Sequence, residues 1–451
     1  MTGRYKAYPE YKDSGVEWLE AVPMHWSSKP LKFMCTCNDE VINESADADY
    51  EIEYVDISSV SAVQGISKTE KVMFGKSPSR ARRIVRDGDV IVSTVRTYLE
   101  AIAPIINPPQ NMIVSTGFAV IRPNQYLDKG FASYCLQAKG FIREVVARSV
   151  GVSYPAINAS DLVEIKVPSL PKSEQQKIAN FLSHETAKID TLITKQEKLI
   201  KLLKEKRQAV ISHAVTKGLN PDAPMKDSGV EWLGEVPEHW AIIPLKHLCR
   251  FSGGGTPTKD NLIYWTNGTI PWVSPKDMKS QRVTQTTDYI TEKAVVESST
   301  NYVDSGALLM VVRSGILQRT IPVAINDVVV TLNQDMKALK FNQKMAVDFA
   351  LHFIVGNEKA LLLEWSKEGA TVESIEHEYL ANGLLPVPPM PEQLSIVQYL
   401  STEMEKFSQL ETRAILGIEL LKERKTALIS AAVTGKIDVR DWQESTYQES
   451  A

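Results

Sequence analysis

The chain has 451 residues, of which 43% are hydrophobic and 24% are charged, and its formal net charge is −4. A chain of this length does not fold around a single core, so roughly two to four domains are expected. The four cysteines form no disulfide framework and lack the spacing of zinc ligands. The opening residues lack the apolar core of a signal peptide, and no apolar run of about 18 residues occurs, so a cytosolic protein is expected.

The first feature in chain order is a phrase that occurs twice. KDSGVEWLEAVPMHW spans Lys12–Trp26, and KDSGVEWLGEVPEHW spans Lys226–Trp240, nearly half the chain further on. Beyond the phrase, Tyr54 corresponds to Trp272 at a slightly larger separation, which then persists, as in the pair Gly88 and Gly306. A period of this size indicates two duplicated, domain-sized halves rather than a solenoid.

The middle of each half is predicted to be a mixed α/β domain. Short apolar runs broken by Gly, Pro and Asn predict strands at 51–60, 89–95 and 118–123 in the first half and at 269–274, 307–312 and 328–332 in the second. Helical periodicity is present at 131–149 and 348–366.

Each half ends in a long segment with an apolar stripe at helical spacing. The stripes are Ile178, Leu182, Ile189, Leu192, Leu199, Leu203 and Val210 in one copy and Ile396, Leu400, Phe407, Leu410, Leu421 and Leu428 in the other. A helix of about 40 residues would be roughly 60 Å long and needs a partner helix to cover its stripe. The duplicated copy is the obvious partner, and a pseudo-two-fold relation would make the pair antiparallel. Two separate core helices are the alternative.

These features together resemble the specificity (S) subunit of type I restriction-modification enzymes. The resemblance rests on the twin opening phrases, on GGGTPTKDNLIYWTNGTIPWVSPKDM (253–278), on STGFAVIRP (115–123), on LNQDMKAL (332–339) and on the twin P-P-EQ entries to the long helices. It covers nearly the whole chain. The first half departs from it by having no counterpart of the GGGTPTKD loop.

The resemblance implies an α+β fold of two pseudo-symmetric halves, each an α/β target recognition domain followed by a long helix, with the two helices packed as an antiparallel coiled coil. The expected boundaries are 1–168 and 218–386 for the recognition domains, 169–217 and 387–436 for the spacer helices, and 437–451 for a C-terminal tail. Each recognition domain would read one part of a split site in double-stranded DNA. The helices would fix the gap between the two parts.

The resemblance also implies that the chain is not itself catalytic. Two modification (methyltransferase) subunits, carrying S-adenosylmethionine, and restriction subunits would be its partners, and no cofactor or metal is expected in this chain. A self-contained methyltransferase or nuclease is one alternative. It is disfavoured because Asn107 to Gln110 lacks the aromatic residue of a methyltransferase loop and no cofactor motif accompanies it. A helical scaffold without a DNA role is the other.

Candidate DNA-binding residues are basic, hydroxyl or amide side chains near loops, together with one glycine of the Gly-rich loop. In the first half they are Arg80, Arg82, Arg83, Arg96, Ser115 and Thr116. In the second half they are Gly254, Thr256, Lys259, Ser274, Lys276, Arg313, Asn333 and Gln334. Arginines and lysines can pair with phosphates or guanine, and amides can read adenine. A solvated loop or an ordinary turn is the alternative for each of them.

The repeated tryptophans Trp18, Trp26, Trp232 and Trp240 have two candidate roles. They could be core residues that lock each half against the helix ends, or they could dock two copies of a partner, which requires a duplicated surface. The core role explains the tryptophans better, whereas docking explains why Asp13, Ser14, Asp227 and Ser228 beside them are also repeated.

Overall fold

The computed structural model describes residues 5–61, 65–366 and 374–443, so the last eight residues of the expected tail lie outside it. The chain forms two compact units. Unit 1 combines Met1–Glu197 with Leu416–Ala451, and unit 2 is Lys198–Ile415. No helix in the described ranges is long and apolar enough to cross a membrane.

Unit 1 contains two four-stranded sheets, in the orders β11-β10-β13-β4 and β8-β5-β12-β9. Two-stranded pairs β1-β2, β3-β14 and β6-β7 flank them. The strands are β1 (Tyr11–Asp13), β2 (Ala21–Pro23), β3 (Ser27–Pro30), β4 (Cys35–Cys37), β5 (Glu51–Val55), β6 (Val60–Ser61), β7 (Gly65–Ile66), β8 (Glu70–Met73), β9 (Ala81–Ile84), β10 (Val90–Ser93), β11 (Ile102–Pro104), β12 (Met112–Ser115), β13 (Phe118–Pro123) and β14 (Lys166–Ser169). The short helices are α1 (Lys129–Leu136), α2 (Lys139–Ala147) and α3 (Ala159–Val163).

Unit 2 repeats this plan with a five-stranded sheet, β18-β26-β23-β24-β20, and a four-stranded sheet, β21-β19-β25-β22. The pairs β15-β16 and β17-β27 flank them. The strands are β15 (Met225–Asp227), β16 (Glu235–Pro237), β17 (Ala241–Pro244), β18 (Cys249–Gly253), β19 (Ile270–Val273), β20 (Arg282–Val283), β21 (Asp288–Ile290), β22 (Tyr302–Val303), β23 (Leu308–Val311), β24 (Val323–Asn326), β25 (Val330–Leu332), β26 (Met336–Phe341) and β27 (Leu384–Val387). The short helices are α5 (Glu292–Glu297), α6 (Val347–Gly356), α7 (Glu358–Trp365) and α8 (His377–Asn382).

The duplication is visible in the strand register. In unit 1, β5 and β12 are parallel, with Val55 opposite Val114. In unit 2, β19 and β25 are parallel, with Val273 opposite Leu332. Val273 follows Val55, and Leu332 follows Val114, at the same separation that relates Trp272 to Tyr54. The separation found in the sequence therefore also describes the sheets.

The continuous apolar runs of the central strands arise because both faces of these strands are buried. On β10, Val90 and Val92 pack into the core shared with the helices, whereas Ile91 packs into a second core between the two sheets. On β23, Leu308 and Leu309 divide in the same way. Each unit therefore has helices on one face of its first sheet and the second sheet on the other.

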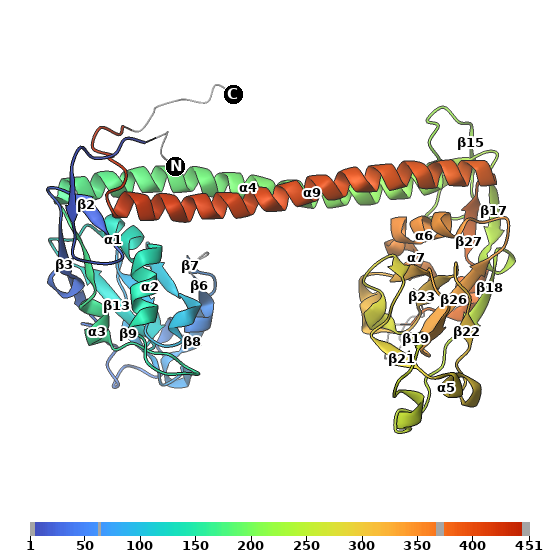
Figure 1. The fold of residues 1–451 in the computed structure, drawn as a ribbon, viewed down its shortest axis with the longest axis horizontal. Helices are drawn as coiled ribbons and strands as arrows, with labels where there is room; N and C mark the ends of the chain where they lie inside the picture. The colour runs from blue at the N-terminus through green and yellow to red at the C-terminus, as the bar shows by residue number, and fades with distance from the viewer. Residues whose placement is uncertain (1–4, 62–64, 367–373, 444–451) are drawn as a thin grey trace. The chain divides into compact units, whose positions relative to one another are not determined.

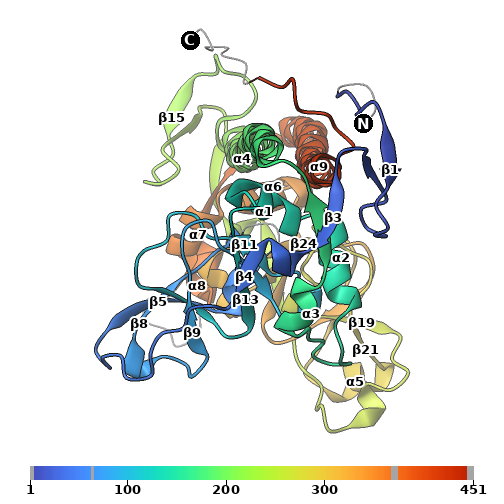
Figure 2. The same cartoon turned by 90° about the vertical axis from the view of Figure 1, so that its left-hand side faces the viewer.

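The two long helices are α4 (Lys172–Lys217) and α9 (Met390–Val433). In unit 1 their shared core joins Ile178 and Ile189 of α4 to Leu428 and Val433 of α9, and Figures 1 and 2 show the two ribbons side by side there. In unit 2 the start of α9, with Ile396 and Leu400, packs against the end of α4, with Ile211 and Val215. The helices are therefore antiparallel in each unit, and the expected fold class is confirmed.

The apolar stripe is not buried along its whole length. Ile178, Leu182 and Ile189 are at most 4% exposed, because the short helices of unit 1 also cover them. Leu192 and Leu199 remain 46% and 43% exposed. Periodicity identified the helix but did not distinguish these two environments.

Candidate nucleic-acid interface

Four of the six candidate residues of unit 1 lie together at the ends of β5 and β12, in a region which we call edge 1: Arg80, Arg96, Ser115 and Thr116. Thr116 N donates to the carbonyl of Arg80 at 2.8 Å. The next residue, Gly117, accepts from Thr94 N at 2.8 Å, which ties the turn to the segment that carries Arg96. The backbone alone therefore gathers these four residues.

Arg80 is the exposed cation of this turn. Its guanidinium pairs with Asp56 at 2.9 Å while its side chain stays 57% exposed. Burial alone would raise the pKa of Asp56, but hydrogen bonds from Tyr54 and Ser58 and the charge of Arg80 together hold that pKa below its ordinary value. Asp56 is thus an ionised anchor that orients Arg80 toward solvent.

Ser115 is fully buried, and its hydroxyl accepts from Gly117 N at 3.3 Å. Its side chain shapes the turn of edge 1 rather than presenting a group at the surface.

Arg82 and Arg83 do not join edge 1. The Arg82 guanidinium lies 5.1 Å from the ring centre of Phe74. Arg83 is half-buried, burial lowers its pKa, and its Nε has no hydrogen-bond partner among the described residues. The run of arginines suggested one basic patch, but consecutive residues of β9 point to opposite faces.

Arg96 adopts the left-handed conformation, with φ of 51°, which costs a non-glycine residue backbone energy. Its guanidinium lies 5.1 Å from the ring centre of Tyr154, on a loop joined to edge 1 by the bridge between Val95 and Ala156. Tyr154 is 66% exposed, and Val152 is fully exposed. Sequence reasoning missed this loop, for which Gly151 and Pro155 were the available turn signal.

In unit 2 the corresponding surface, which we call edge 2, comprises Gly254, Thr256, Arg313, Asn333 and Gln334. Gly255 N donates to Leu332 at 2.8 Å, and Thr256 hydrogen-bonds Gln334. A Cβ at Gly254 would lie 1.9 Å from the Asn333 carbonyl oxygen, so only glycine permits this approach. The Gly-rich loop is therefore held against the end of β25.

Arg96 and Arg313, the candidate arginines that follow a buried strand in each unit, do not occupy equivalent positions. Arg313 forms a β-bridge with Ser374, and Val95 forms one with Ala156. Arg313 follows Val95, and Ser374 follows Ala156, at the constant separation of the repeat, so the two bridges correspond. Arg96 therefore corresponds to Ser314. Arg313 is exposed, and its N donates to the carbonyl of Asp335 at 3.3 Å, which places it beside Asn333 and Gln334.

A cavity of about 500 Å³ in unit 2 brings together four of the candidate residues. Its lining includes Lys259, Ser274, Lys276 and Asn333, with Trp265 and Trp272. Ser274 donates its hydroxyl to Asp277 at 2.8 Å and so caps a turn. Lys276 pairs with Asp288 at 2.7 Å, and this hydrogen bond raises the pKa of its ammonium group.

The structure separates the repeated tryptophans into two groups. Trp26 and Trp240 are completely buried, so neither presents a surface to a partner, and the docking role expected for them gives way to the core role. Trp18 and Trp232 are half-buried. Trp18 donates to the carbonyl of Lys166 at 3.0 Å, and Trp232 lies 6.1 Å from Phe353, measured between ring centres.

The repeated polar residues build a turn in each unit. Asp13 accepts from Gly15 N at 2.9 Å, and Asp227 accepts from Gly229 N at the same distance. Ser14 and Ser228 each accept from the backbone N two residues later, at 3.1 Å. Turn geometry is sufficient to explain why these four polar residues are duplicated.

Glu174 and Glu392 of the P-P-EQ entries secure the opening phrases to the long helices. The Glu174 carboxylate accepts hydrogen bonds from His25 at 2.8 Å, from Trp26 at 3.1 Å and from Tyr8 at 2.6 Å. The Glu392 carboxylate accepts a hydrogen bond from His239 at 2.7 Å, whereas Trp240 Nε1 has no hydrogen-bond partner in the described part of the chain. These contacts are the physical reason for the pairing of each phrase with its distant EQ dipeptide.

A family model described as the type I restriction modification DNA specificity domain matches residues 34–202 and 237–420. These two matches together cover most of the chain. The chain therefore belongs to the family of type I restriction-modification specificity subunits. It has two recognition domains, and like its relatives it is the non-catalytic component of such an enzyme.

Among its relatives, the EcoR124I/EcoR124II specificity subunit of Escherichia coli is 38% identical over 195 residues, which is 43% of this chain and 44% of that protein. The chain thus matches less than half the length of this relative. The putative MjaX specificity subunit of Methanocaldococcus jannaschii is 22% identical over 443 residues, covering 95% of this chain and 98% of that one.

Two solved structures share the fold. One comes from work on complex assembly and conformational transition of the type I R-M system, with a TM-score of 0.72, 22% identity and coverage of 92% of this chain and 99% of that chain. The other is the HsdS subunit of Thermoanaerobacter tengcongensis, with a TM-score of 0.56, 22% identity and coverage of 92% and 98%.

Proposed function

We propose that this chain binds a DNA target made of two unlike parts, one read by edge 1 and the other by edge 2. The observation that carries the proposal is that the same backbone framework occurs twice with different side chains on it. Arg80 and Arg96 stand on edge 1, and Arg313, Asn333 and Gln334 stand on edge 2. Cationic and amide groups contact phosphates and base edges, so unlike sets read unlike sequences.

The recognition domains are assigned to 1–168 and 218–386, and the spacer helices to 169–217 and 387–436. The chain would hold two modification subunits, which methylate the DNA, and restriction subunits would join the complex. Trp18 and Trp232 are the half-buried positions of the repeated phrase that this assembly could contact on both halves. The support is that the phrase and the helix junction occur twice, as binding two copies of one protein requires.

Methylation mapping in a host that carries the chain with its modification subunit tests the proposal. The expected result is one split motif, absent from a host that lacks the chain. Replacing Arg80 and Arg96 with alanine should relax or abolish recognition of one part, and replacing Arg313 with alanine should affect only the other. Loss of both parts from either variant, with the protein still folded, would contradict the assignment of one edge to each part.

The helices are proposed to set the gap between the two parts. Four residues, about one helical turn, inserted after Lys195 should lengthen the methylated gap or abolish methylation. The matched control is the same insertion after Asp222, in the exposed turn that follows α4, which leaves both helices intact. An unchanged gap in the Lys195 variant would refute the role of the helices.

Gel-shift experiments separate this proposal from the two alternatives. The chain together with a modification subunit should prefer DNA that contains the mapped site over random DNA. A scaffold without a DNA role would show no preference, and a self-contained enzyme would methylate or cut DNA unaided.

A further inference from the structure

The cavity beside edge 2 is partly open to solvent and brings indole, ammonium and amide groups together. We call it the aromatic pocket and define it by Lys259, Trp265, Trp272, Lys276 and Asn333. The two indole rings meet edge to face, with their centres 5.1 Å apart at 89°. Trp265 Nε1 donates to Thr258 at 3.2 Å, and Trp272 Nε1 donates to Gly255 at 3.0 Å. Trp272 is only 5% exposed and forms the back of the pocket, so the half-buried Trp265 is the indole whose ring surface a ligand can contact.

The polar groups of the aromatic pocket stand where a nucleotide would need them. Lys259 is exposed, and Asp288 holds the Lys276 ammonium group at 2.7 Å. Asn333 is 6% exposed, and its Nδ2 lies 3.4 Å from Asp335, a long contact that leaves this donor able to bind a ligand. A flat aromatic group with polar edges and phosphates on both sides complements this combination, because bases stack on indoles and phosphates pair with lysines.

A base that remains paired and stacked in a duplex cannot enter a concave pocket. Beside the pocket, however, a short 3-10 helix (Leu262–Tyr264) exposes two large apolar side chains. Leu262 is 71% exposed and also lines the pocket, and Ile263 is 60% exposed. Apolar side chains of this kind can enter a base step and occupy the space that a displaced base leaves.

We propose that the aromatic pocket receives one nucleotide turned out of the DNA duplex beside the part of the target read by edge 2, while Leu262 and Ile263 fill the vacated step. The base lies against Trp265, and its flanking phosphates pair with Lys259 and Lys276. This inference rests on the proposed function. It adds a sequence-tolerant contact, because every base has a face that can stack.

The test uses the full chain in complex with its modification subunits and duplexes that carry the mapped site. A single mismatch is moved through the second part of the site and the base pairs next to it. A mismatch removes part of the cost of unpairing, so affinity should rise about tenfold at one position and fall or stay level elsewhere. The Trp265→Ala variant should lose this rise while still preferring the site over random DNA.

Leu262→Ser is a second variant, chosen because this exposed side chain contributes little to folding. It should reduce the gain in affinity at the mismatch position about threefold or more. Tyr379→Ala, an exposed aromatic residue outside the pocket lining, is the matched control and should retain the full rise. Site-specific binding by the unaltered chain without a gain at any mismatch position would overturn this inference and leave the proposed function standing. Failure of the unaltered complex to prefer its site would overturn both.

Discussion

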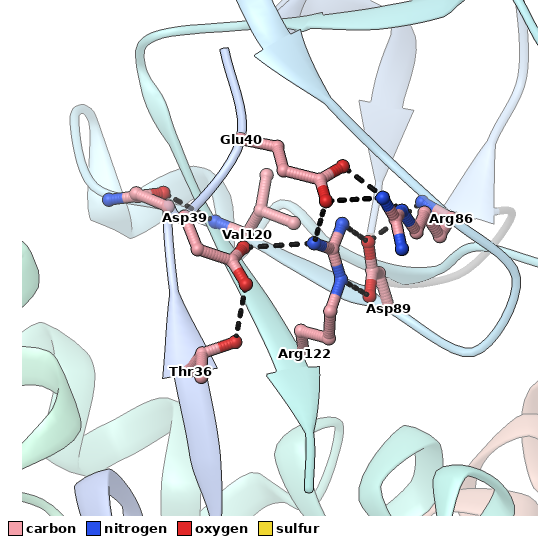
Figure 3. Close-up of polar contacts among 8 residues, drawn as sticks. Thr36, Asp39, Glu40, Arg86, Asp89, Val120 and Arg122 are labelled. Carbon is pink, nitrogen blue, oxygen red and sulfur yellow. Dashed lines mark hydrogen bonds and ion pairs between the residues drawn. The ribbon is translucent and has the colours of Figure 1, made fainter.

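Strand β13 of unit 1 and strand β26 of unit 2 occupy the same place in their sheets, yet the side chains that hold them differ. Arg122 of β13 forms two hydrogen bonds with Asp89, at 3.0 and 2.8 Å, and pairs with Asp39 at 3.0 Å (Figure 3). At the aligned position of β26, exposed Lys340 donates to the carbonyl of Ser305 at 2.8 Å. The aligned counterpart of Asp89 is the buried Ala307.

The comparison shows which interactions determine the shared topology. The parallel strand pair, the bridge next to it and the antiparallel helices recur in both units through backbone hydrogen bonds and apolar packing. The charged network of Figure 3 belongs to unit 1 alone among the described residues. The fold therefore depends on the backbone hydrogen bonds and apolar packing that both units share. The side chains that differ between the units can instead contribute to local stability and recognition.

The largest expected effect comes from removing the cation of the network. Arg122→Met leaves the Asp89 side chain, 2% exposed, without its charge partner, and breaking a buried pair in this way costs about 3–5 kcal/mol. Lys340→Met, the matched control, should cost less than about 1 kcal/mol because that lysine is exposed. Denaturant unfolding gives the loss, and peptide-resolved hydrogen exchange should place it in unit 1. Equal losses in the two variants would contradict the comparison.

A smaller difference is expected at the two helix ends. Gly435 and Gly218 follow α9 and α4 with φ of 73° and 76°. Replacing either with alanine costs about 1–2 kcal/mol for the left-handed backbone. A Cβ at Gly435 would also lie 2.4 Å from Pro23 Cδ, in a rigid ring, whereas the nearest atom to one at Gly218 is 3.2 Å away. Thermal unfolding should therefore show a greater loss for G435A by about 1–3 kcal/mol.

The junction glutamates should differ next. Glu174→Gln changes a buried acceptor shared by Tyr8, His25 and Trp26 and should cost about 1–2 kcal/mol. Glu392→Gln changes an acceptor that serves His239 at a more exposed position, 29% exposed, and should cost less than about 1 kcal/mol. Unfolding midpoints of the two variants, measured side by side, test the order. A larger effect at Glu392 would show that the extra contacts of Glu174 contribute nothing.

The smallest effect concerns alkaline pH. Burial of Tyr8, followed by its hydrogen bond to Glu174, raises the pKa of its hydroxyl group above the ordinary value near 10. The folded chain thus keeps this proton above pH ~10 while the unfolded chain loses it, so the stabilising contribution is present below that pH and declines as the pH rises. Unfolding midpoints from pH 8 to 11 should decline less steeply for Tyr8→Phe than for the unaltered chain. Parallel curves would refute the assignment.

The sequence was sufficient to predict the duplication, the mixed sheets and the antiparallel long helices, because periodicity and repetition are local or regular signals. It did not predict that 131–149 and 348–366 would each form two helices, which are α1 with α2 and α6 with α7. The stacking of Arg96 on Tyr154 and the pairing of Arg122 with Asp89 join distant segments, which periodicity does not report.

Unit 1 is built from two stretches of chain with the whole of unit 2 between them. Its core requires Leu428, Ala432 and Val433 of α9, and Asp438 N donates to the carbonyl of Lys6 at 2.8 Å. During synthesis on the ribosome, unit 2 therefore has all of its residues first. The domain that begins the polypeptide cannot close until translation is nearly finished, so a nascent chain should expose the unpaired half of α4 to chaperones for about half of its elongation.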